Sequence, residues 1–217
     1  MPVRVGLQYI AQWKESLEAQ VAAYEAEPAE TGKIVFYGPS YYTRWSKKWG
    51  HIPLAEALRG QSGAPCCINR GFGSSCAEHQ LYYYPRMIRP LAPKVLVYCP
   101  TANNGCFGYD NKESFELAQR VVTYALCDFP EITVYIAGCQ AKREMSAQDM
   151  ADADELNAML AQFAADTPRC RFFNPLSCEA LRAPENFVAD GVHFNQVGYD
   201  AYTAYFKEIL KDELAQF

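Results

Sequence analysis

The stretch that decides the fold is Lys33-Ile34-Val35-Phe36-Tyr37-Gly38-Pro39-Ser40. It is a short, mostly apolar run rich in β-forming residues, and it stops at a Gly-Pro-Ser turn. Similar runs follow at residues 65–68, 94–99, 132–137 and 170–173. Strands that are apolar along their whole length are typical of parallel sheets buried on both faces. The sequence therefore predicts a central, mainly parallel sheet of five strands.

Helix-like stretches separate these strands, at residues 52–58, 77–91, 112–126, 147–165 and from 195 to the C-terminus. A further helix is predicted at about 8–27, before Pro28. Apolar residues recur there at three- and four-residue spacing: Ile10, Trp13, Leu17, Val21 and Tyr24. Strands that alternate with helices indicate parallel βαβ units. We therefore expect residues 1–217 to form a single domain, a three-layer α/β/α sandwich of the flavodoxin-like type.

The composition narrows the class of partner. The chain has 217 residues, half of them hydrophobic, with a formal net charge of -5 and a pI of about 5.3. This acidic balance argues against nucleic acid or an anionic membrane as the main partner. No apolar run approaches the length of a membrane span, and the N-terminus shows no export signal. The sequence therefore predicts a cytoplasmic protein, and it predicts no particular oligomeric state.

The cysteines and histidines do not form a metal-binding pattern. There are nine cysteines, but no C-x-x-C pair occurs, and the chain has only three histidines. We expect reduced thiols, with Cys66, Cys67 and Cys99 as small core residues in strand-like runs. No metal site and no organic cofactor are expected.

Ser40 directly follows the first predicted strand. In an open parallel sheet the active crevice lies outside the carboxyl ends of the strands, so this serine would face a substrate. Serine is a weak nucleophile unless a base accepts its proton. The alternative is a residue that only ends a strand or caps a helix, roles that serine often has.

A base and its partner are found near the C-terminus, in Asp190-Gly191-Val192-His193. An aspartate three residues before a histidine can reach the imidazole, fix its tautomer and stabilise the imidazolium. The alternative is a surface loop that caps the last helix.

Donors for a developing oxyanion could come from the tails of the second and third strands, Gly71-Phe72-Gly73-Ser74-Ser75 and Asn103. Taken alone, these tails are also consistent with two ordinary loops.

Together these blocks resemble the SGNH/GDSL hydrolases, in order and in approximate spacing. The resemblance runs from about Lys33 to Tyr205, most of the chain. The four blocks that carry it are Ile34 to Ser40, Asn69-Arg70-Gly71-Phe72-Gly73-Ser74, Thr101-Ala102-Asn103-Asn104, and Asp190 to His193 with the continuation Phe194-Asn195 and Gly198-Tyr199.

The resemblance implies a role for each block. Ser40 would be the nucleophile and its N–H an oxyanion donor, with His193 as the base and Asp190 as its partner. Ser74, where the family has glycine, would supply a backbone N–H. If its φ is positive, Gly73 is the alternative donor. Asn103 would complete the oxyanion hole, although Thr101 and Asn104 replace the family's Gly and Asp around it.

The resulting hypothesis is a serine esterase that works through an acyl-enzyme on a short-acyl ester. An acetylated carbohydrate or another small ester would be the substrate. One rival is a non-catalytic binding domain that retains the fold. Another is a binder of phosphate or flavin on the same sheet. Such binders carry a loop rich in Gly, Ser and Thr after the first strand. The first strand here is followed instead by Pro39-Ser40-Tyr41-Tyr42, which fits that pattern poorly.

Overall fold

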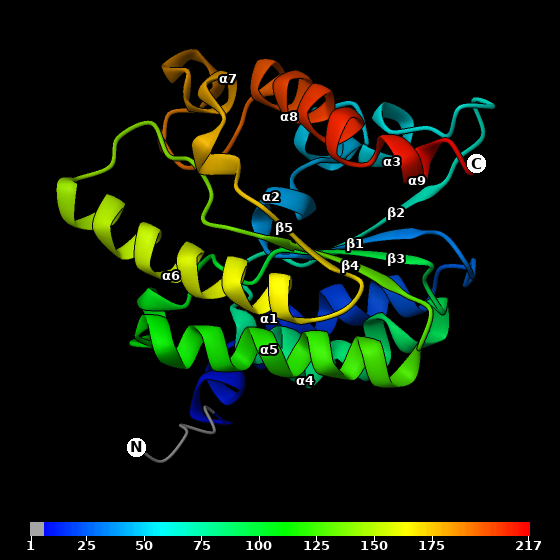
Figure 1. Cartoon of the computed structure of the whole chain (residues 1–217), viewed down its shortest axis with the longest axis horizontal. Helices are drawn as coiled ribbons and strands as arrows, with labels where there is room; N and C mark the ends of the chain where they lie inside the picture. The colour runs from blue at the N-terminus through cyan, green and yellow to red at the C-terminus, as the bar shows by residue number, and fades with distance from the viewer. Residues whose placement is uncertain (1–6) are drawn as a thin grey trace.

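A five-stranded parallel sheet forms the centre of the computed structural model, which describes residues 7–217 (Figure 1). The strand order is β2-β1-β3-β4-β5, and every pairing is parallel. The strands are β1 (Ile34–Gly38), β2 (Cys67–Gly71), β3 (Val95–Tyr98), β4 (Thr133–Ala137) and β5 (Cys170–Phe173). The predicted parallel sheet is confirmed.

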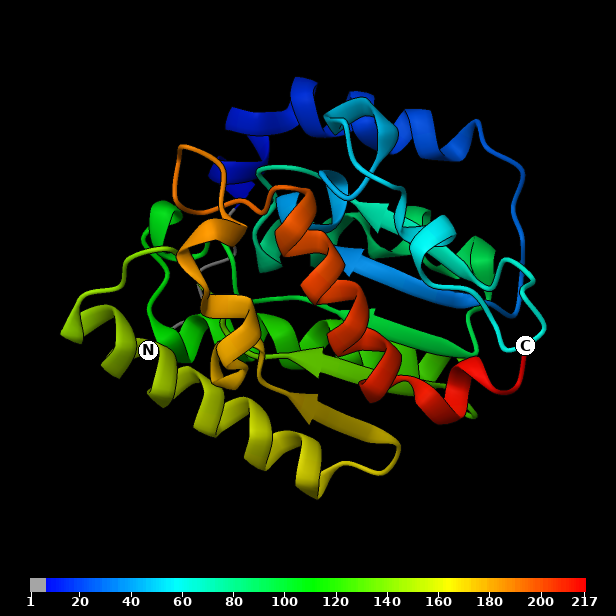
Figure 2. The same cartoon turned by 90° about the horizontal axis from the view of Figure 1, so that it is seen from above.

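Two layers of helices cover the sheet, as Figures 1 and 2 show. On one face lie α1 (Leu7–Glu25), α4 (Ala77–Met87), α5 (Asn111–Asp128) and α6 (Ala147–Asp166). On the other lie α8 (Gln196–Ile209) and the short helices α2 (Ser40–Thr43), α3 (Leu54–Ala57), α7 (Glu179–Arg182) and α9 (Lys211–Leu214). Single 3-10 turns occur at Lys47–Trp49, Arg89–Leu91, Gly105–Phe107, Pro175–Ser177 and Pro184–Asn186. This is the expected three-layer α/β/α sandwich.

Each inner strand feeds both hydrophobic cores, because successive side chains point to opposite faces of a sheet. In β1, Ile34 and Phe36 join the core beneath α8, whereas Val35 and Tyr37 join the core beneath α1, α4, α5 and α6. All four side chains are fully buried. The uniformly apolar runs in the sequence therefore reflect burial on both faces.

The second strand differs from the prediction. We expected residues 65–68 to form the strand and Asn69-Arg70-Gly71 to follow it, but β2 includes these three residues. The physical reason is that β2 is an edge strand, so polar side chains find partners beside it. Asn69 donates to the Tyr42 carbonyl at 2.7 Å, and Arg70 pairs with Glu27 at 2.7 Å.

The predicted helices are in the right places, but several are shorter than expected. The stretch 52–58 forms only α3, α4 ends at Met87 before a separate 3-10 turn, and the last helix breaks at Leu210. The short helices α2 and α7 were not predicted, since four residues are too few to show a helical period. The predicted helix at 8–27 is α1, with Leu17 and Val21 buried. The side chains of Ile10 and Trp13 lie outside the described part.

An aromatic cluster fastens α8 to the segment that follows β1. The Trp45 ring stacks on Tyr199 and Tyr202, with centroids 5.4 and 5.5 Å apart. The Tyr199 hydroxyl also donates to the Tyr41 carbonyl at 3.0 Å. These contacts fix the start of α8, and the loop just before it, against α2.

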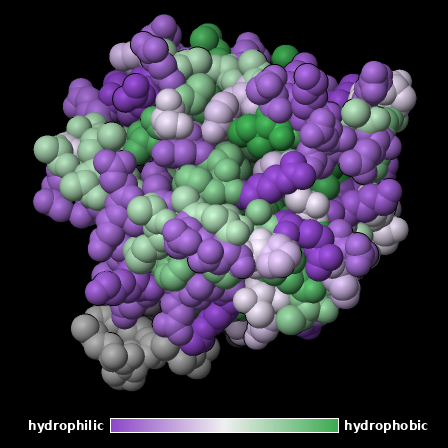
Figure 3. Space-filling view, viewed as in Figure 1, coloured by the Kyte–Doolittle hydropathy of each residue, from purple (hydrophilic) through white to green (hydrophobic). Residues whose placement is uncertain are grey.

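The face in Figure 3 carries hydrophobic side chains in small groups between hydrophilic ones. Among the helices of residues 7–217, none is both long and apolar enough to cross a membrane.

Candidate active site

Two glycines bring α2 close to the carboxyl edge of the sheet. A Cβ on Gly38 would lie 2.8 Å from the Cβ of Cys99, and one on Gly71 would lie 2.3 Å from the Thr43 nitrogen. Real Cβ atoms do not approach so closely, so only glycine fits these positions. As a result α2 begins immediately after β1 and Pro39, and Ser40 is its first residue.

Three predicted residues meet at this edge, although Ser40 lies 153 positions before His193 in the sequence. The Ser40 Oγ lies 2.8 Å from Nε2 of His193. The Nδ1 of the same ring lies 2.8 Å from Oδ2 of Asp190. In the neutral ring that carries its proton on Nδ1, the ring donates to the carboxylate and accepts from the serine hydroxyl. This is the hydrogen-bond order that a serine nucleophile and its base require.

Asp190 is fixed by its own turn. Its Oδ1 accepts hydrogen bonds from the backbone N–H groups of Val192 and His193, both at 2.9 Å. Burial opposes the charged form, but these two N–H groups and the imidazole outweigh it and hold the pKa of Asp190 well below its usual range. The carboxylate therefore stays ionised beside the ring.

His193 is kept neutral by its surroundings. Burial lowers the pKa of the imidazole, its hydrogen bond to the Asp190 carboxylate raises it, and the positive charge of Arg44 lowers it further. The net shift is downward from 6.5. A neutral imidazole can accept a proton from Ser40, so the ring is in the form of a general base near neutral pH.

Asn103 also lies at this edge, with Ser40, in the wall of the same cavity. Its φ is +67°, a left-handed conformation that asparagine tolerates well. The side-chain Nδ2 donates to the Ser75 carbonyl at 2.8 Å, which ties the tail of β3 to the tail of β2. An amide nitrogen carries two hydrogens, so a second N–H is left for a ligand.

Ser74 sits in an exposed turn after β2 and is not one of the residues that line the cavity. Its φ is +68°, the condition under which we expected Gly73 to be the donor instead. However, the Gly73 N–H already donates to Oε1 of Gln20 on α1, at 2.7 Å. Among the residues whose side chains the structure describes, 15–217, none accepts a hydrogen bond from the Ser74 N–H. The positive φ is also what a position that usually holds glycine would show.

A cavity of about 730 Å³ opens beside Ser40 and His193. One wall consists of the loop after β3, and the other of residues after β4. The far end lies between the first turns of α5 and α6 and carries acidic and polar side chains: Asp110, Asn111, Ser114, Asp149, Asp152 and Glu155. Lys142 is the basic residue of the lining. A volume of this order suits a small organic ligand.

The far end of this cavity was not anticipated from the sequence. The available signal was the pair of helix starts: Asp110 caps α5 by accepting from the Glu113 N–H, and Ser146 caps α6 by accepting from the Asp149 N–H. Caps mark where helices begin, but they do not reveal that two helix starts face the same cavity.

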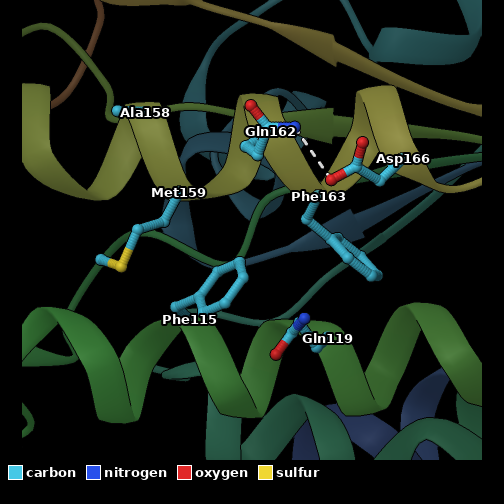
Figure 4. A pocket seen from close by; sticks show the side chains of 7 residues that line it. All are labelled: Phe115, Gln119, Ala158, Met159, Gln162, Phe163 and Asp166. Atoms are coloured by element: carbon cyan, nitrogen blue, oxygen red, sulfur yellow. Dashed lines mark hydrogen bonds between the residues drawn. The ribbon is translucent and has the colours of Figure 1, made fainter.

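A second hollow lies between α5 and α6, away from these residues (Figure 4). Phe115, Met159 and Phe163 give it an apolar floor, and Gln162 donates to Asp166 at its edge. Asp166 is its ionisable residue and no nucleophile lies beside it in the lining, so we do not assign it chemistry.

The other histidines lie elsewhere. His51 lies in a bend, and His79 is fully buried in the first turn of α4. The nine cysteines are free thiols, with Cys66, Cys67 and Cys99 buried as expected. In the part of the chain that the structure describes, no cluster of His, Cys, Asp and Glu could hold a metal ion.

Comparison with known proteins places the fold. No family model and no curated protein matches the sequence. Many solved structures match the fold. One is a protein from Streptococcus pneumonia, provisionally named as a platelet activating factor, with a TM-score of 0.72 and 17% identity over 96% of this chain and 97% of that one.

Two further matches carry enzyme names. A GDSL-like lipase from Bacteroides thetaiotaomicron has a TM-score of 0.67 and 16% identity over 94% of this chain and 99% of its own. An acetyl xylan esterase has a TM-score of 0.64 and 19% identity over 80% of this chain and 98% of its own. The chain therefore has the SGNH/GDSL hydrolase fold. At these identities the likeness is one of fold, and the chemistry has to be argued from the site.

Proposed function

We propose that the protein is a serine esterase in which Ser40 is the nucleophile, His193 the general base and Asp190 its partner. The observation that carries the proposal is the continuous hydrogen-bonded chain from Ser40 to Asp190, with both links at 2.8 Å. Activation of a serine requires such a base, and the base in turn needs a group that orients it. Solved structures of this fold that bear esterase and acylhydrolase names support the same class of reaction.

The reaction would proceed in two steps. Ser40 Oγ attacks the ester carbonyl while His193 Nε2 takes its proton, and the new imidazolium is stabilised by Asp190. His193 then passes the proton to the departing alcohol, which leaves an acyl group on Ser40. Water, deprotonated by the same ring, attacks the acyl-enzyme, and the serine is released with its proton restored.

Three donors are assigned to the oxyanion. Ser40 is the first residue of α2, so its N–H has no acceptor within the helix. The Ser74 N–H lacks a protein acceptor in the described residues, and the amide of Asn103 has a second hydrogen to offer. Donors that are fixed before the reaction stabilise the charge that develops in the tetrahedral intermediate.

The cavity favours a small, polar ester without negative charge. Its distal lining carries four carboxylates, from Asp110, Asp149, Asp152 and Glu155, against the single lysine Lys142. A cavity lined mainly by one sign of charge repels ligands of that sign. Hydroxyl-rich acyl carbohydrates fit these acceptors, and one structure of this fold is a family 3 carbohydrate esterase from Clostridium thermocellum. A short-acyl ester of a neutral polyol is thus the proposed substrate class.

The decisive experiment is Ser40→Ala, tested with p-nitrophenyl acetate. Turnover should disappear while the thermal unfolding curve stays unchanged, because Ser40 is a small side chain at the start of α2. Ser46→Ala is the matched control, since its hydroxyl donates to the Thr43 carbonyl in the same segment and lies outside the cavity. A Ser40→Ala protein that retains a tenth of the activity would assign the nucleophile elsewhere. A wild-type protein that binds esters without turnover would favour the binding-domain alternative.

A further inference from the structure

Arg44 occupies a position between the proposed catalytic carboxylate and an exposed tryptophan. It is the residue that directly follows α2, four positions after Ser40. Its Nη1 lies 3.4 Å from Oδ2 of Asp190, and its guanidinium carbon lies 4.4 Å from the ring centroid of Trp49. The side chain thus contacts the carboxylate on one side and an aromatic face on the other.

We propose that Arg44, held by Trp49, is a positioning residue that orients Asp190 and keeps His193 unprotonated. This proposal rests on the proposed function of the Ser40–His193–Asp190 group. Arg44 is not one of the residues that line the cavity, so it would act through Asp190 rather than on a substrate.

The contacts of Asp190 explain why a further partner is needed. Its Oδ1 is fixed by two backbone N–H groups, but Oδ2 has the imidazole of His193 as its close partner. The side chain is 42% exposed, so water competes for the free side of Oδ2. The Arg44 guanidinium approaches this same oxygen. It can therefore hold the carboxylate in the plane that the ring requires.

Arg44 also joins the nucleophile to the base as one structural unit. Ser40 is the first residue of the turn that ends at Arg44, while Asp190 and His193 belong to the loop before α8. The Arg44–Asp190 contact bridges these two segments over 146 positions of sequence. A shift of α2 relative to the loop would therefore disturb the ion pair as well as the Ser40–His193 hydrogen bond.

The charge of Arg44 has a second consequence for the base. Asp190 favours the imidazolium form of His193, whereas Arg44 disfavours it. Tyr41 also packs against the ring, with centroids 5.9 Å apart, and the charged residues Lys142 and Asp149 line the same cavity. Arg143 lies against Gly191 and donates to the carbonyls of Phe187 and Val188, so it supports the same loop. Of the two arginines, Arg44 is the one that faces Oδ2.

Trp49 is 45% exposed, which is unusual for so large an apolar side chain. Stacking on the guanidinium gives it a partner and limits the rotamers of Arg44. The 3-10 turn that carries Trp49 is held by its backbone, because the N–H groups of Trp49 and His51 donate to the Ser46 carbonyl at 3.0 and 3.2 Å. The segment between α2 and α3 thus restricts the position of the Arg44 side chain through Trp49.

The test compares Arg44→Met, Arg44→Lys and Lys47→Met with the wild type. Lys47→Met is the matched control, because it removes a positive charge from the same segment but touches neither Asp190 nor the cavity. Arg44→Met should lower kcat by about two- to fivefold, as expected for a partly exposed ion pair, and leave KM nearly unchanged. The acid limb of the kcat profile should move to higher pH, because the imidazolium loses a repelling charge. Arg44→Lys should restore the wild-type limb in part, and Lys47→Met should match the wild type.

A second readout does not depend on turnover. The pKa of His193, followed by NMR and assigned with His193→Gln, should rise in Arg44→Met and stay at the wild-type value in Lys47→Met. An unmoved pKa together with an unmoved acid limb would overturn the role of Arg44. Loss of activity in Arg44→Met with no pH shift and no rescue by lysine would reduce it to a packing residue. Failure of the proposed function itself would look different, because Ser40→Ala would then leave turnover intact.

Discussion

Asn103 and Asn104 are neighbours of the same type with different surroundings. Asn103 lies in the cavity wall beside Ser40 and keeps a spare N–H. Asn104 is almost fully buried: its Oδ1 accepts from the Ala77 N–H at 2.9 Å, and its Nδ2 donates to the Pro100 carbonyl at 2.8 Å. Both residues line the cavity, but the Asn103 side chain has an N–H left for a ligand, whereas the Asn104 side chain holds the start of α4 to the tail of β3.

We therefore predict separate effects for the two alanine variants. Asn103→Ala should lower kcat by about 10²–10³, the usual loss for one oxyanion donor, with little change in KM. Because an alanine would have to adopt a φ of +67° and the bond to Ser75 would be lost, this variant should also lose about 1–2 kcal/mol in the free energy of unfolding. Asn104→Ala should reduce the free energy of unfolding by about 1–3 kcal/mol without that loss in kcat, because it leaves a buried N–H and a buried carbonyl without their partner. Urea unfolding and steady-state kinetics on both proteins check this. The reverse pattern would place the third block one residue further along.

The ionisation of His193 predicts the pH dependence of the reaction. The imidazole must be neutral to accept the proton of Ser40, so activity should rise as pH increases through its pKa. Burial and Arg44 outweigh Asp190 and lower that pKa below 6.5. The acid limb of kcat/KM should therefore lie below pH 6.5. A rate profile from about pH 4 to 9 measures it, and a limb well above this value would contradict the assigned surroundings of the ring.

At the scale of elements, the site depends on how closely α2 packs against the edge strand β2. The Gly71 position faces the backbone of α2: an added Cβ would meet the Thr43 nitrogen and the Tyr42 carbonyl carbon at 2.3 and 2.6 Å. Asn69 on the same strand donates to the Tyr42 carbonyl. The helix that begins at Ser40 is therefore positioned by β2 as well as by β1.

Gly71→Ala should consequently displace α2. We expect a loss of about 1–3 kcal/mol in the free energy of unfolding, as for overpacked cores, together with a reduced kcat. Gly73→Ala is the matched control in the same tail, because its nearest contacts are at 3.7 Å or more, an ordinary van der Waals distance. Thermal melts and p-nitrophenyl acetate turnover on the two variants test the difference. Equal behaviour of the two would show that α2 does not depend on this contact.

At the scale of the whole molecule, four carboxylates gather in the lining of the cavity beside Ser40. Asp110 directly precedes α5, and Asp149, Asp152 and Glu155 lie in the first half of α6. The net charge of -5 adds to this local field. Repulsion of anions by such a field weakens as salt screens it, with a Debye length of about 10 Å at 0.1 M.

We predict that an ester with a carboxylate on its acyl chain reacts more slowly than the neutral ester of similar length. At low salt, kcat/KM for the neutral ester should exceed that for the anionic ester by roughly two- to tenfold, and this ratio should shrink at 1 M salt. The double variant Asp152→Asn/Glu155→Gln should narrow it, since both carboxylates line the cavity. Glu30→Gln/Glu131→Gln serves as the control. Both residues are exposed and lie just before β1 and β4, at the amino ends of the strands, whereas the cavity lies at the carboxyl ends. A ratio that neither salt nor the first double variant changes would contradict charge selection.

The sequence by itself determined that a parallel sheet forms, and the order of strands and helices along the chain. Apolar runs such as residues 34–37 and 95–98 had to be buried on both faces, and helical spacing marked α5 and α6 to within a residue or two. It also indicated Ser40, Asp190, His193 and Asn103, because strand tails and a D-x-x-H turn are local patterns. These signals depend on neighbours along the chain, which is why a single sequence can carry them.

Only the tertiary structure decided which of these groups meet, and what surrounds them. The hydrogen bond between Ser40 and His193 spans 153 positions, and the Arg44–Asp190 contact spans 146. The cavity lies between the starts of two helices, and the Gln20 side chain of α1 occupies the Gly73 N–H and leaves that of Ser74 as the candidate donor. Contacts of this kind arise from packing between elements, and no periodicity or spacing within an element encodes them.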